Sequence, residues 1–218
     1  CDLLGIDYPV MLAAMAPDVS DPQLVAAVSE AGGIGVLACG DKDPDEIVAL
    51  AAETRQLTGK PFGMAIALPA RVETYGFDFR EAAAKAKIQP QHLAFSERFL
   101  RERGIPFDDD TSRATPGMSS VAAYKLGETF SRQQVKAILQ ERPALFVSAL
   151  GDPSFMVAEA RARGIKVMSV VGKVKDAVNV ARGGIDAVIC TGTAAGGHSG
   201  EVDGMVLVPH VVERVAPV

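Results

Sequence analysis

The sequence contains no tryptophan, only three cysteines and three histidines, and no long apolar run. Cys1, Cys39 and Cys190 are an odd and widely spaced set, which argues against a disulfide framework and indicates a reducing compartment. A membrane-spanning helix needs roughly 18–20 consecutive apolar residues, and no segment approaches that length. No basic-then-apolar signal peptide opens the sequence. We therefore expect a cytoplasmic protein with no membrane partner.

Basic residues are too few and too scattered to form a nucleic-acid surface. Lysine and arginine number 22 against 27 acidic residues, giving a formal net charge of −5, and no stripe of positive charge is formed. We therefore expect no nucleic-acid partner. Hydrophobic residues make up 48% and charged residues 22% of the 218 residues, which is typical of a globular chain with one large or two small domains.

Short apolar runs of strand length alternate with helical segments along the chain. Asp21-Pro22 and Asp43-Pro44 each pair a capping side chain with proline at the first helical position. Helices are predicted from these positions and over 131–141, 152–163 and 174–182, and 205–215 forms a short strand or helix. The predicted strands are 9–15, 34–38, 62–68, 144–148, 165–170 and 187–190. This alternation predicts an α/β protein with a parallel sheet and right-handed crossovers.

The alternation of strands and helices is interrupted at about residues 69–130. We interpret this segment as a helical insertion in a single domain spanning 1–218. Helical patterns occur at 80–87 and 91–104. The run Asp108-Asp109-Asp110 lacks a fourth ligand at a suitable spacing, so we predict a solvated loop there and no metal site. Long segments inside compact domains are often functional, and a lid over a site is one such role.

Two architectures fit the alternation: an open doubly wound sheet and a (β/α)₈ barrel of the TIM type. A dinucleotide-binding fold carries GxGxxG after its first strand, but Ala14-Met15-Ala16-Pro17 stands there instead. Candidate functional residues follow the carboxyl ends of the short strands, which is where barrel enzymes place their sites. The sequence therefore favours the (β/α)₈ barrel, with about six βα units present.

A glycine-dense loop, 192–200, follows the last predicted strand and contains His198. Glycine lets backbone N–H groups approach a ligand closely, and a histidine exchanges protons near neutral pH. Taken alone, the loop is explained more readily by a tight turn with a solvated imidazole than by a binding site.

Four segments, in order, resemble the nitronate monooxygenase family: 9–15, 29–37, 60–63 and 192–200. The same family includes an FMN-dependent enoyl-acyl-carrier-protein reductase. The resemblance implies a (β/α)₈ barrel that binds FMN at the carboxyl ends of its strands and oxidises a small-molecule nitronate with molecular oxygen. The alternatives are an FMN-dependent NAD(P)H enoyl or quinone reductase on the same scaffold and a non-catalytic barrel. The sequence is also compatible with a homo-oligomer.

The resemblance also implies the site residues. His198 would be the catalytic histidine, acting as a base or steadying the anionic substrate, and Ala14 and Met15 would contact the flavin ring through their backbone. The implied cofactor-binding set is Ala14, Met15, Ala65, Thr191, Gly196 and Gly197.

Three positions depart from the family pattern. The family often has asparagine at Ala65, glutamine at Thr191 and glutamate at Ala194. The two lost amides remove expected hydrogen bonds to the flavin, each contributing about 1 kcal/mol net, and Thr191 can still donate one. The flavin contacts and the substrate can therefore differ from those of the family.

Six predicted strands fall short of the eight that close a barrel. The glycine-rich loops that bind the FMN phosphate in the family have no counterpart in this sequence, which also begins without methionine. We therefore expect a fragment that lacks the last two strands, or a chain completed by a partner, with weak FMN binding or none. Flavin absorbance retained by these 218 residues through gel filtration would refute this expectation.

Overall fold

The computed structural model describes residues 1–16, 18–68, 89–105 and 128–216. The chain divides into two compact units, one formed by Cys1–Tyr75 with Leu126–Val218 and the other by Gly76–Lys125. The predicted helix at 80–87 and the aspartate loop at 108–110 lie outside the described residues. Within the second unit, α4 (Pro90–Arg101) corresponds to the helix predicted at 91–104.

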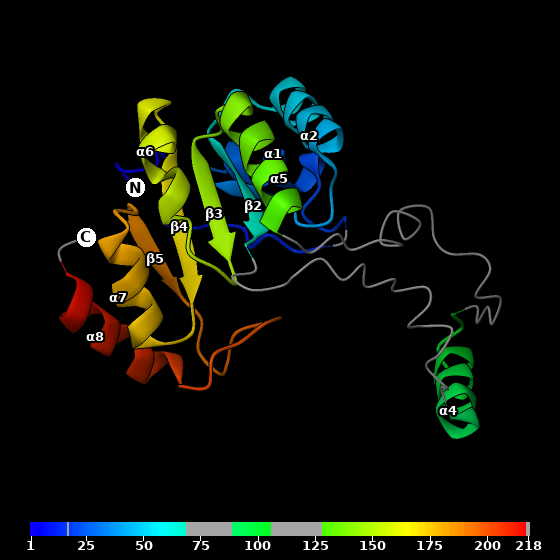
Figure 1. Ribbon diagram of the computed structural model, residues 1–218. Helices are drawn as coiled ribbons and strands as arrows, with labels where there is room; N and C mark the ends of the chain where they lie inside the picture. Colours follow the sequence, from blue (N-terminus) through cyan, green and yellow to red (C-terminus); the bar gives the residue numbers. More distant parts are fainter. Residues whose placement is uncertain (17, 69–88, 106–127, 217–218) are drawn as a thin grey trace. The chain divides into compact units, whose positions relative to one another are not determined.

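The first unit is built on a parallel sheet whose five described strands follow one another in chain order (Figure 1). The strands are β1 (Gly35–Ala38), β2 (Phe62–Ala67), β3 (Leu145–Ala149), β4 (Lys166–Val171) and β5 (Ala187–Cys190). A doubly wound sheet reverses its strand order at a switch point, and no reversal occurs among these strands. The unreversed order is that of a (β/α) barrel wall.

Helices connect the strands and pack on one face of the sheet. They are α1 (Pro22–Glu30), α2 (Pro44–Leu57), α5 (Glu128–Glu141), α6 (Ser154–Ala162), α7 (Val174–Arg182) and α8 (Gly204–Val215). Asp21 caps α1 by accepting from the Leu24 N–H at 2.8 Å, as the sequence predicts. The segment for which strand and helix were both open, 205–215, is the helix α8.

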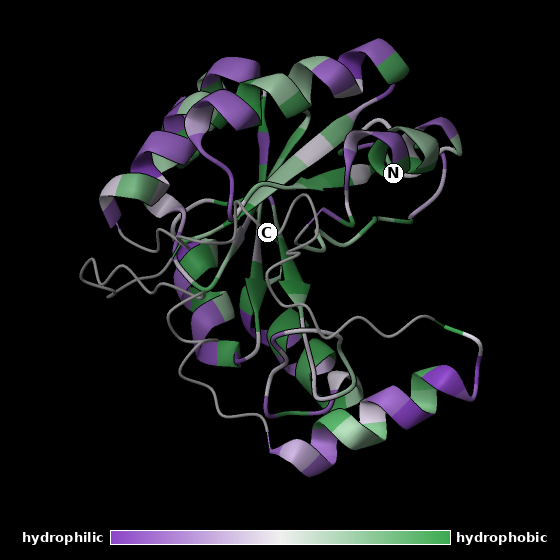
Figure 2. Ribbon diagram, turned by 90° about the vertical axis from the view of Figure 1, so that its right-hand side faces the viewer, coloured by the Kyte–Doolittle hydropathy of each residue, from purple (hydrophilic) through white to green (hydrophobic). Residues whose placement is uncertain are grey.

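The two faces of the sheet bury different side chains. Leu37, Met64 and Phe146 face the helices and belong to the larger apolar core. Alternate residues, among them Val36 and Val147, form a smaller inner cluster. Figure 2 shows the strands coloured mainly as hydrophobic and the helices with polar and apolar residues alternating along them. The amphipathic helices therefore cover one face, and the other faces the barrel interior.

A pair of hydroxyl groups interrupts the apolar contact between the sheet and the helices. Ser148 and Ser169 are directly opposite in the parallel register of β3 and β4. Both side chains are buried, and the Ser148 Oγ donates to the Ser169 Oγ at 2.9 Å. Each hydroxyl therefore finds its partner inside the fold rather than in solvent.

The predicted first strand, 9–15, is not formed as a covered strand. A single parallel bridge joins Met11 to Ile34, and Val10 and Met11 are exposed. The ladder stops because Ser20 takes the next backbone groups: its Oγ donates to the Ala13 carbonyl oxygen and accepts from the Met15 N–H. The run lies beside β1 as one bridge followed by a turn.

Candidate functional site

The carboxyl ends of the parallel strands meet at one edge of the sheet, and the loops that follow them form the candidate site. Figure 1 shows β3 and β4 ending at the edge beside which the loop after β5 extends. Backbone hydrogen bonds continue past the strands at this edge, from Cys39 to Ala65 (2.9 Å) and from Thr191 to Val171 (2.9 Å). Sites of (β/α) barrels lie at this edge.

Ser20 fixes the conformation of the Ala13–Met15 segment. Its buried hydroxyl donates to the Ala13 carbonyl oxygen at 2.8 Å and accepts from the Met15 N–H at 2.9 Å. Its own N–H donates to the Met15 carbonyl oxygen at 3.0 Å. In the described part of the chain, no hydrogen bond uses the backbone N–H or carbonyl of Ala14. The turn therefore holds both neighbours of Ala14 while its own peptide groups remain available to a ligand.

Small side chains line the inner face of the sheet near this edge. Ala38 and Ala65 are opposite each other in the register of β1 and β2, and Ala67 is opposite Ala149 in that of β2 and β3. Ala65 is buried and belongs to the inner apolar cluster. Alanine leaves room above a strand end, so this part of the wall can accommodate a flat ring.

The base of the loop after β5 is locked by close backbone packing. A Cβ on Gly200 would lie 2.4 Å from the Thr191 carbonyl oxygen and 2.9 Å from that of Gly172. The Gly200 N–H donates to the Thr191 carbonyl oxygen at 3.1 Å. The Thr191 hydroxyl donates to the Val171 carbonyl oxygen at 3.2 Å, so toward a ligand it offers an acceptor and not the donor that the sequence leads us to expect.

The tip of the same loop is open. Gly196, Gly197 and His198 are exposed, and a Cβ on either glycine would meet no atom within 4 Å. Gly197 has a φ of 69°, a conformation that glycine adopts without strain. Among the residues that the structure describes, none forms a hydrogen bond with the His198 side chain or with the N–H groups of 196–198. These groups are available to a bound molecule.

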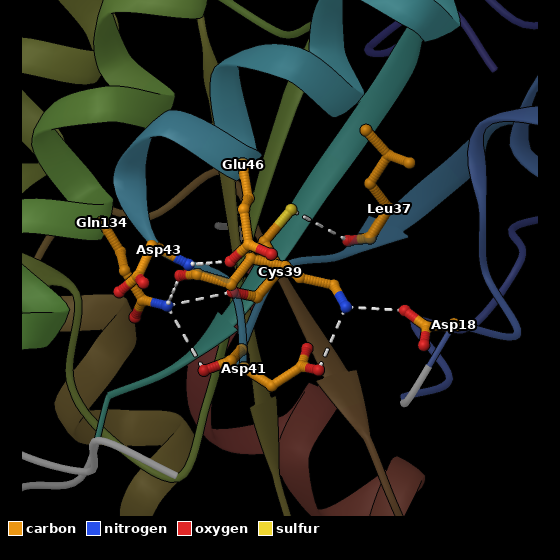
Figure 3. Close-up of polar contacts among 9 residues, drawn as sticks. Asp18, Leu37, Cys39, Asp41, Asp43, Glu46 and Gln134 are labelled. Atoms are coloured by element: carbon orange, nitrogen blue, oxygen red, sulfur yellow. Dashed lines mark hydrogen bonds and ion pairs between the residues drawn. The ribbon is translucent and has the colours of Figure 1, made fainter. Parts of the chain in front are cut away.

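A charged cluster in the loop between β1 and α2 is a feature that the sequence analysis missed. The Lys42 ammonium lies 2.6 Å from Asp18 Oδ1 and 3.2 Å from Asp41 Oδ2. Figure 3 shows Asp18 and Asp41 on two sides of this nitrogen. Burial lowers the pKa of Lys42, but the hydrogen bond to Asp18 and the charge of Asp41 outweigh it, so the pKa is raised. The run Asp41-Lys42-Asp43, separated from the end of β1 by two residues, was the available signal.

Cys39 precedes this cluster and is a buried structural thiol. Burial, with a contribution from the charge of Asp41, raises its pKa to about 12. Its Sγ lies 3.8 Å from the Leu37 carbonyl oxygen. Cys190 is half-buried, and burial raises its pKa as well. All three cysteines are free thiols.

Four further polar residues include the other two histidines. Ser148 lies among the buried residues between sheet and helices and bonds Ser169. Lys173 is exposed and lies 3.4 Å from Glu201. His92, on α4, and His210, on α8, are both exposed. His198 lies on the loop after β5, at the carboxyl edge of the sheet.

The unpaired backbone groups of Ala14 and of the loop tip include the N–H donors and the carbonyl acceptor that a flat heterocycle with carbonyl and N–H edges requires, so their chemistry fits a flavin ring. No three His, Cys, Asp or Glu side chains among the described residues are grouped so as to hold a metal ion. Within the same residues, no helix combines the length and apolarity needed to cross a membrane.

A family model and curated relatives point to the same family. A family model described as nitronate monooxygenase matches residues 1–218. A nitronate monooxygenase of Paraburkholderia phytofirmans is 33% identical over 204 residues, which cover 92% of this chain and 50% of that protein. The chain spans about half the length of the curated relatives it matches.

Solved structures show the same fold. FabK from Thermotoga maritima matches with a TM-score of 0.68 at 29% identity, covering 98% of this chain and 50% of that chain. A nitroalkane oxidase from Streptomyces ansochromogenes matches with a TM-score of 0.69 at 26% identity, covering 97% of this chain and 57% of that chain. Together with the unreversed parallel sheet, these matches confirm the predicted (β/α) barrel type, of which the described strands form a part.

Proposed function

The chain belongs to the nitronate monooxygenase family of oxidoreductases, and we propose that it is the His198-bearing part of an FMN-dependent enzyme that oxidises nitronates with molecular oxygen. The observation that carries this proposal is the loop after β5, which is locked at Gly200 and open at His198. An exposed imidazole on an anchored loop at the carboxyl edge of a barrel wall is suited to meet a substrate.

Four groups of atoms would hold the flavin. The free N–H and carbonyl of Ala14 and the N–H groups of Gly196 and Gly197 offer hydrogen bonds, and Ala65 leaves space at the wall. The Thr191 hydroxyl, which already donates to Val171, offers lone pairs. When bound, FMN supplies electron transfer to oxygen, which no protein side chain can provide.

His198 acts on the substrate. A nitronate carries delocalised negative charge, and a neighbouring imidazole and preorganised backbone N–H groups stabilise such charge. On a neutral nitroalkane the same imidazole acts as the general base that takes the proton from the carbon next to the nitro group. The closely packed base anchors the loop that carries the imidazole, since a Cβ on Gly200 would overlap the Thr191 and Gly172 carbonyl oxygens.

A reductase on the same scaffold is the second candidate, and the likeness to FabK at 29% identity favours it. The departure at Ala65, where the family often has asparagine, also distinguishes this chain from the usual nitronate site. A reductase would need NAD(P)H as hydride source, whereas nitronate oxidation consumes oxygen without it.

The proposal also covers the insertion and the cellular location of the protein. Residues at about 69–130 are an insertion in the barrel, which is supported by the separate unit Gly76–Lys125. The protein works in the cytoplasm, which is supported by its three free cysteines.

The test is oxygen consumption by the FMN-loaded protein with a nitronate such as propyl-2-nitronate, measured with an oxygen electrode in the absence of NADH. We expect His198→Gln to lower the rate by about 10²–10⁴-fold, the usual contribution of a positioned acid or base. His210→Gln is the matched control, because His210 is equally a surface histidine but lies on α8. Strict dependence on NADH would favour the reductase, and equal rates in both variants would remove His198 from the mechanism.

A further inference from the structure

Asp18 holds a backbone conformation that needs support. Its φ is 55°, in the left-handed region that non-glycine residues adopt rarely, with aspartate among the more tolerant. It follows the Ala13–Met15 segment whose middle peptide groups are free, and its side chain is 47% exposed. A half-exposed residue in this conformation is kept there by the contacts of its side chain.

The contact that holds Asp18 is a buried ammonium group. The Lys42 side chain is 9% exposed, and its Nζ lies 2.6 Å from Asp18 Oδ1 and 3.2 Å from Asp41 Oδ2. Asp41 is 2% exposed, and its Oδ1 has no hydrogen-bond partner among the described residues. Lys42 is therefore fixed from one side by a buried carboxylate and reaches outward to Asp18 with the shorter of its two contacts.

The loop that carries Lys42 is itself anchored to a helix. The buried Gln134 of α5 places its amide nitrogen 3.0 Å from the Cys39 carbonyl oxygen and 2.8 Å from that of Lys42. Figure 3 shows Gln134 approaching this loop opposite Asp18. A buried amide that lost these acceptors would leave its N–H groups unpaired, so the arrangement is strongly specified. A continuous chain of contacts runs from α5 through Lys42 to Asp18.

We propose that Lys42 and Asp18 are positioning residues for the Ala13–Met15 segment, and that their ion pair holds it in the conformation that presents the Ala14 backbone to a flavin. Ser20 closes this turn from within, and the ion pair ties it to the loop after β1. The ligand in this inference rests on the proposed function, whereas the conformation of the segment does not.

The ion pair has a chemically matched counterpart elsewhere on the surface. Glu159 of α6 lies 2.7 Å from Arg163, with a side chain that is 57% exposed. Asp18→Asn and Glu159→Gln each replace a half-exposed carboxylate in a short ion pair by an amide of equal size. Asparagine tolerates the left-handed conformation as aspartate does, so Asp18→Asn removes charge without adding backbone strain, and Lys42 keeps Asp41.

The experiment compares the 218-residue wild type with both variants by two measurements. Amide hydrogen exchange, read by mass spectrometry on peptides covering 12–20, reports the order of the segment without any ligand. Titration with FMN, followed by visible circular dichroism, reports how the ring is seated. We expect Asp18→Asn to raise exchange in this peptide by about tenfold, the effect of weakening a charged hydrogen bond, and to change the spectrum of bound FMN. Glu159→Gln leaves both unchanged.

The outcomes separate this inference from the proposed function. Unchanged exchange at 12–20 in Asp18→Asn overturns the positioning role, whatever FMN does. Raised exchange with an unaltered FMN spectrum and affinity overturns the link to the flavin. If the wild type binds no FMN, the proposed function fails for this chain, and exchange alone decides whether the ion pair positions the segment.

Discussion

Replacing Gly200 by alanine tests whether the loop that carries His198 is held by its base. The new Cβ would lie 2.4 Å from the Thr191 carbonyl oxygen and 2.9 Å from that of Gly172. Both oxygens belong to the backbone, so a side chain cannot move aside to make room. The loop backbone around residue 200 must therefore move. Overpacking of this kind reduces stability by about 1–3 kcal/mol, and the loss of the Gly200 N–H hydrogen bond adds about 1 kcal/mol. Because the open tip of the loop can take up part of the displacement, we expect the lower end of the combined range, about 2 kcal/mol.

The assay is thermal unfolding followed by circular dichroism, with Gly196→Ala as the control. For a chain of this size about 2 kcal/mol corresponds to a fall of about 4–8 °C in Tm. A Cβ on Gly196 meets no atom within 4 Å, and its φ is not in the left-handed region. Gly196→Ala is therefore neutral or slightly stabilising. Equal Tm values for the two variants would refute the view that the base of the loop is closely packed.

Three further predictions concern the loops at the same edge. Ser20→Ala removes two hydrogen bonds to the Ala13–Met15 segment and should lower the free energy of unfolding in urea by about 1–3 kcal/mol; an unchanged midpoint would argue against the turn. At pH 8, iodoacetamide should label the exposed Cys1 and leave Cys39, with its pKa near 12, unlabelled by peptide mass spectrometry, and comparable labelling would contradict its burial. Because the pKa of Lys42 is raised above 10.5, its ion pairs stabilise the fold fully below pH 10.5 and weaken as pH rises through the raised value. The free energy of unfolding lost on Lys42→Met, measured in urea, should therefore be constant between pH 8 and 10 and shrink above that range. A loss that grows with pH would contradict a raised pKa of Lys42.

The regular part of the fold follows from local sequence. The five described strands differ from the predicted runs by at most one residue at either end. Glycines and capped helices bound the apolar runs and so leave little choice of where each strand begins and ends. Asp21 caps α1 as expected. Chain-order pairing of these strands also agrees with the barrel that the motifs predict.

The first predicted strand failed because an apolar run does not show which backbone groups a neighbour will take. Ser20 directly precedes the capping residue Asp21 in the sequence, and its hydroxyl bonds Ala13 and Met15 and ends the ladder after Met11. This contact depends on how the turn folds back, and no periodicity encodes it.

The sequence analysis located the glycines and the histidine of the candidate site. It did not identify the residues that hold the neighbouring loops in place. Motif similarity locates His198 and Ala14, since these lie in segments that resemble the family. Lys42 and Gln134 are 92 residues apart in sequence and meet only through the packing of α5 on the loop after β1. A single sequence carries no pairwise signal for such contacts, and the roles of the site residues stay predictions until the assays above are made.

The buried hydroxyl pair of Ser148 and Ser169 bears on how the chain selects its alignment as it folds. If β3 slid by two positions along β4, Ser148 would come opposite Val167 or Val171, on the same face as before. Both hydroxyls would then lack partners in a dry environment, at about 1–3 kcal/mol each, while the apolar side chains would find near-equivalent neighbours. The two serine hydroxyls therefore favour the native register of β3 along β4, which apolar contacts alone would distinguish only weakly from a register shifted by two residues.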